Sequence, residues 1–142
     1  MTYTDMSQAM YQFFSQFTYG GMPIAAYKQG HVPNDAAFPY FTFRVSMGDF
    51  NGTTFPAAFL WCKHSPGINV NAQRAAILDM VAAEIPPMVG RMYRAHNGGA
   101  MWIKRNEDFL SDYEPPDDTD ESATDEGEPI IGARIALSVT TF

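Results

Sequence analysis

The stretch 38–64 constrains the fold most, because it holds two strand-like runs in succession. In residues 38–47 every second position is apolar, at Phe41, Phe43, Val45 and Met47. A period of two is typical of a strand with one buried face. Residues 48–52 contain two glycines and predict a turn. In residues 55–64 both the even-numbered and the odd-numbered positions are mostly apolar, so both sides of this strand are expected to be covered. We therefore expect an antiparallel hairpin at the middle of a sheet. Its second strand would be covered by a helix on one face and by a neighbouring subunit on the other.

Two helices are predicted on either side of this hairpin. Residues 4–18 repeat apolar side chains at helical spacing, at Met6, Met10, Phe13, Phe14 and Phe17. Thr4 or Asp5 is the expected N-cap of this helix, and Gly20-Gly21 its expected end. The second helix spans residues 71–85, is rich in alanine, and stops at Pro86-Pro87. Asn69 and Asn71 both remain open as its N-cap.

Three further segments have strand character. Residues 24–27 predict a short edge strand, and residues 91–105 predict a hairpin around Asn97-Gly98, which suits a type I′ turn. The last twelve residues alternate, with one apolar parity at Ile131, Ala133, Ile135, Leu137 and Val139. Together these segments predict an α+β domain. Its sheet would be mostly antiparallel, with a mixed sheet left open, and would have about four to six strands. The two main helices would pack on one face of the sheet.

The negative charge of the chain is concentrated in one segment. Of sixteen acidic residues, nine lie between 112 and 128, and no Lys or Arg lies among them, whereas the rest of the chain has seven acids and nine bases. With 142 residues, one domain over 1–142 is the expectation. We expect a flexible acidic loop at about 110–129, because low hydrophobicity and uniform charge oppose packing. The spacing of an EF-hand calcium loop is absent there, which leaves only a weak, nonspecific cation site as an alternative.

Sequence motifs of catalysis are missing, and we expect no enzyme, no catalytic residues, no cofactor and no metal site. The chain has no phosphate-binding glycine loop and no nucleophile elbow. His31, His64 and His96 fall in a loop, at a strand end and in a turn, so we expect them to be structural or exposed. Cys62 is the single cysteine and lies within a predicted strand, so we expect it to be a buried apolar side chain.

A nucleic-acid-binding alternative rests on the 91–105 hairpin. Its bases are Arg91, Arg94, Lys104 and Arg105, and Tyr93 and Trp102 lie between them. Basic side chains with interleaved aromatic rings are typical of single-strand binding. A solvated hairpin face has the same composition, and the acidic segment that follows would repel a polyanion. We therefore favour the solvated face.

No apolar run approaches the roughly 18 residues that span a bilayer. The N-terminus lacks a basic region followed by an apolar one, so we expect no signal peptide and an origin in a reducing cytosol.

Three stretches of the chain resemble one family. They are residues 26–33 followed by 38–43, the helix-proline-hairpin region around 80–105, and the acidic segment leading into residues 130–137. In this order they resemble the tail terminator proteins, also called tail completion or minor tail proteins, of long-tailed bacteriophages with non-contractile tails. They span most of the chain, and none of them is a catalytic signature.

The resemblance implies a structural virion protein at the head-proximal end of the tail, made in the cytoplasm of the host bacterium. It implies a homohexameric ring that caps the tail tube, ends polymerisation of the tube protein and offers the joining surface to a head-side connector or neck protein. DNA would pass through the lumen without specific binding, and no membrane would be involved. The acidic loop could face the lumen or the outer rim.

Two other function classes remain open from the sequence. One is a different phage neck or head-completion connector, and the other is a small-molecule-binding α+β domain. On excess apolarity alone, we predict that Phe55, Phe59, Leu60 and Trp61 lie near a subunit interface.

Overall fold

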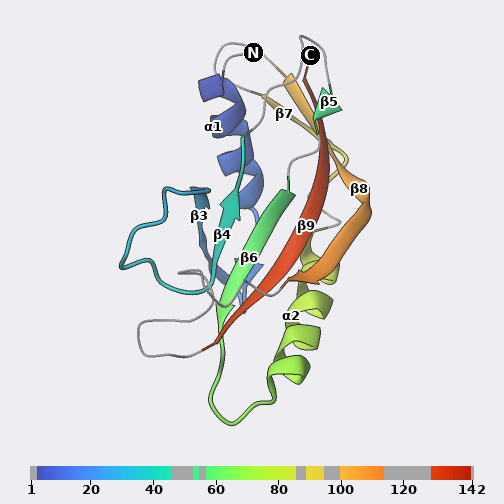
Figure 1. The fold of residues 1–142 in the computed structure, drawn as a ribbon. Coiled ribbons are helices and arrows are strands. Elements are labelled where there is room, and N and C mark those ends of the chain that lie inside the picture. Colours follow the sequence, from blue (N-terminus) through green and yellow to red (C-terminus); the bar gives the residue numbers. More distant parts are fainter. Residues whose placement is uncertain are drawn as a thin grey trace.

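The computed structural model describes residues 3–45, 53–54, 57–85, 89–94, 100–113 and 129–141 (Figure 1). Its elements, in chain order, are α1 (Tyr3–Phe14), β1 (Thr18–Tyr19), β2 (Met22–Pro23), β3 (Ala25–Lys28), β4 (Tyr40–Phe43), β5 (Thr53–Thr54), β6 (Ala57–Lys63), α2 (Val70–Glu84), β7 (Arg91–Arg94), β8 (Ala100–Tyr113) and β9 (Ile130–Thr141). The predicted α+β class is therefore confirmed.

The main sheet has seven strands, more than the predicted four to six. Six follow the order β3-β4-β6-β9-β8-β7, and β5 pairs with β9 beside this path. Only the β3–β4 pair is parallel, so the sheet is mixed and mostly antiparallel. The two predicted runs pair antiparallel as β4 and β6, with Tyr40 opposite Trp61, although β4 ends at Phe43, earlier than predicted. The centre of the sheet, however, is formed by β6 and β9.

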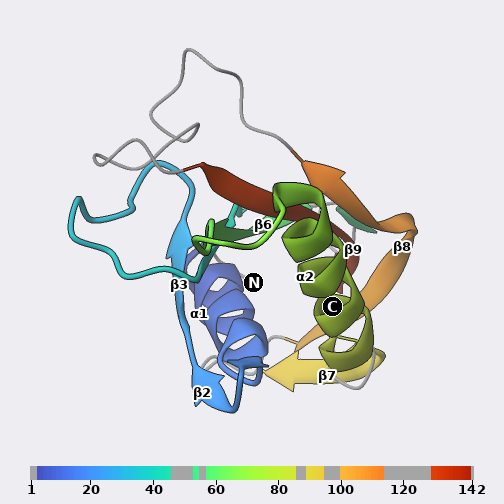
Figure 2. The ribbon, with the colours of Figure 1, turned by 90° about the horizontal axis from the view of Figure 1, so that it is seen from below.

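The sheet curls around α1 instead of lying flat beneath it (Figure 2). On one side Phe14 packs against Phe41 of β4, with ring centroids 4.7 Å apart. On the other side Phe13 meets the ring of Tyr93 in β7 at 5.7 Å. Three strands separate β4 from β7 in the sheet order. A single helix can contact both only if the sheet bends, so the prediction of two helices packed on one face of the sheet is only roughly met.

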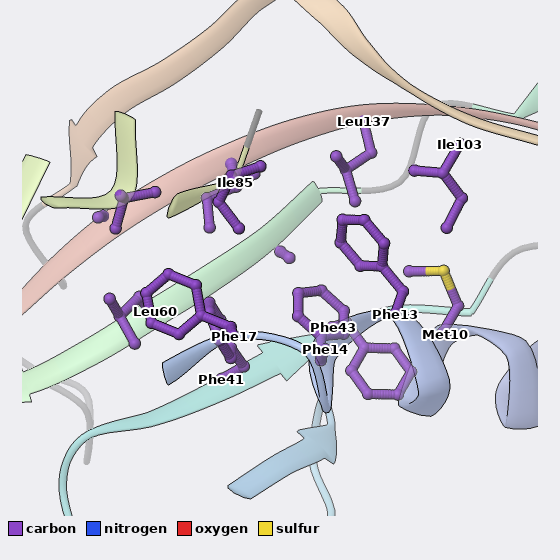
Figure 3. Close-up of a cluster of buried hydrophobic side chains, with 14 of the residues drawn as sticks. Met10, Phe13, Phe14, Phe17, Phe41, Phe43, Leu60, Ile85, Ile103 and Leu137 are labelled. Atoms are coloured by element: carbon purple, nitrogen blue, oxygen red, sulfur yellow. The ribbon is translucent and has the colours of Figure 1, made fainter. Parts of the chain in front are cut away.

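Both helices supply side chains to one core (Figure 3). The five apolar residues predicted to form one stripe in the first helix are all at most 2 % exposed. From α2, Ile77, Val81 and the adjacent Ile85 join them, and β9 adds its predicted apolar parity. The spacing of apolar residues therefore predicts correctly which side of α1, α2 and β9 faces the core.

Several predicted helix boundaries differ from those in the structure. The first helix already begins at Tyr3, so Thr4 and Asp5 lie within it and are not its N-cap. It ends at Phe14, and Gly20-Gly21, with φ values of 59° and 83°, turn the chain between β1 and β2 instead. Positive φ at both central residues is typical of a type I′ hairpin. The second helix is capped by Asn69, whose Oδ1 accepts from Asn71 N at 2.9 Å and Ala72 N at 3.2 Å.

The acidic loop was predicted to begin at about residue 110, which is earlier than the structure allows. Strand β8 continues to Tyr113 and pairs with β9, with Asp112 opposite Ala133. Ser111 and Asp112 have a low propensity for strands, and backbone hydrogen bonding to the long partner strand β9 offsets it. Residues 114–128 of the predicted loop, the Asn97-Gly98 turn and Pro86-Pro87 lie outside the described residues.

Candidate interaction surface

The two faces of β6 have different surroundings. Ala58, Leu60 and Cys62 point to the helix side and belong to the buried core cluster. Phe59 and Trp61 take the opposite parity, and their rings stack with centroids 5.4 Å apart. Among the described residues, both helices lie on the side of Leu60, so no helix covers Phe59 and Trp61 (Figure 2).

Trp61 is held in place within its own chain. Its Nε1–H donates a hydrogen bond of 2.8 Å to Thr42 Oγ1 on the neighbouring strand. Its ring also stacks on that of Phe59, and Trp61 is only 4 % exposed. Phe59 itself is half-buried. A charged side chain at position 61 would therefore disturb the fold as well as the surface, so Phe59 is the better probe of a contact with a partner.

Further aromatic rings extend this surface across β3 and β4. Tyr40 lies opposite Trp61 in the β4–β6 pairing. Its ring is 5.7 Å from that of Tyr27 in β3 and 5.0 Å from that of Phe38. All three of these rings are half-buried. We call Tyr27, Phe38, Tyr40, Phe59 and Trp61 the aromatic face.

Within the four strands that form and border the aromatic face, the charged side chains have one sign. Strands β3, β4, β6 and β9 contain three bases and no acid. Arg134 in β9 is directly opposite Phe59, on the outer side of the sheet. Lys63 shares the parity of Phe59 and Trp61, whereas Lys28 takes the other parity and lies over the Tyr3 ring at 4.8 Å. The surface is therefore aromatic with a basic margin.

The residues predicted at an interface divide into three groups. Phe59 and Trp61 lie on the aromatic face, and Phe55 lies outside the described residues. Leu60 is fully buried in the core of the protomer, so we leave it out of the proposed contact surface. Sequence reasoning did not include Tyr27, Phe38, Tyr40 or Arg134. The sequence does contain a signal for Tyr40, because it alternates with Phe41 and Phe43 and so lies on the side of the strand away from the core.

The stacking platform of the nucleic-acid alternative is not present. Tyr93 is on the core side, 8 % exposed, and its hydroxyl accepts a hydrogen bond of 2.7 Å from Gln16 Nε2. Trp102 lies on the opposite face of the hairpin, paired with Thr140. Because the two rings point to opposite sides of the sheet, they do not form one surface for stacking bases.

Among the described residues, the side chains of Cys62 and His64 make local contacts. Burial raises the pKa of the Cys62 thiol to about 12, partly opposed by a hydrogen bond with Tyr19. The ring Nε2 of His64 lies 2.6 Å from the carbonyl oxygen of Ile68, a local contact within one loop. Within the described ranges, His, Cys, Asp and Glu form no group of three or more suited to a metal ion.

The described helices include none that is long and apolar enough to cross a membrane.

Comparison with known proteins gives no relative: no family model, no curated protein and no solved structure matches this chain.

Proposed function

We propose that the protein is a phage tail terminator, a ring of six copies that caps the tail tube and offers a surface to the head-side neck protein. The observation that carries this proposal is the aromatic face. Five rings gather on the side of the sheet that neither described helix covers. Four of these rings, those of Tyr27, Phe38, Tyr40 and Phe59, are half-buried in the protomer, so part of their apolar area remains to be buried on assembly.

The fold supports the same proposal. The resemblance implies an α+β protomer, and this chain has that class with a curled, mostly antiparallel sheet. A second surface would be needed on each protomer, because a ring requires two different contact patches that meet head to tail. The nine acids between 112 and 128 suit a protein next to passing DNA, since like charges repel.

The test is capping of growing tubes. The tail tube protein encoded in the same genome is allowed to polymerise with and without this protein, and tube lengths are measured by electron microscopy. We expect shorter tubes with a ring at one end. Tubes of unchanged length with no bound ring would contradict the proposal. A ring that bound only the head-side connector would point to a different neck protein.

A further inference from the structure

We draw no further inference here: the strongest candidate, the outer side of the main sheet where the half-buried Phe59 lies opposite Arg134, belongs to the surface already described, and nothing in the structure shows what covers it.

Discussion

At the residue scale, burial in the core lowers the reactivity of the Cys62 thiol. The thiol is 2 % exposed on the core side of β6, and burial raises its pKa from 9.0 to about 12. The thiolate, which is the reactive form, is therefore scarce at neutral pH in the folded protein. Its position within a strand predicts this burial from the sequence, since free cysteines are among the most buried residues.

The raised pKa of Cys62 also predicts that the folded protein loses stability at high pH. The unfolded thiol ionises from about pH 9, whereas the folded thiol keeps its proton until about pH 12. The free energy of unfolding should therefore fall as the pH rises between these values, by about 1.4 kcal/mol at pH 10. Denaturant unfolding at pH 7 and pH 10 measures this fall. In Cys62→Ala the fall should be smaller by that amount, and an identical fall in both proteins would contradict the assignment.

At the element scale, sequence patterns predict which side of an element is buried better than where the element begins. The alternation in β9 and the spacing in α1 identify core residues correctly, because burial follows side-chain periodicity. The start of α1 and the role of Gly20-Gly21 were predicted wrongly, since several nearby residues suit a cap or a turn equally well. The same ambiguity affected the N-cap of α2, which the structure assigns to Asn69.

The cap of α2 can be tested by comparing two asparagines. Asn69→Ala should lower the free energy of unfolding by about 1 kcal/mol, because two backbone N–H groups lose their acceptor. Asn71→Ala is the matched control, since its side chain accepts only an exposed hydrogen bond from Arg74 Nη1 at 2.8 Å. Denaturant unfolding gives both values. An equal effect of the two substitutions would show that Asn69 is not the stabilising cap.

At the scale of the whole molecule, the curl of the sheet and the aromatic face come from contacts that periodicity does not encode. The pattern of β4 shows that Tyr40 and Phe41 point to opposite sides, but not that Tyr40 lies beside Trp61 or Tyr27. These neighbours follow from the strand order, which joins segments far apart in the sequence. For the same reason the predicted subunit interface grouped Leu60, which points to the core, with Phe59 and Trp61, and it did not include Arg134.

The measurement that tests the central claim most directly is the mass of the purified protein in solution. Light scattering is recorded at low and at moderate salt. We predict a species near six times the 15.8 kDa protomer. A mass of 15.8 kDa at both salt concentrations and at high protein concentration would contradict a self-assembling ring.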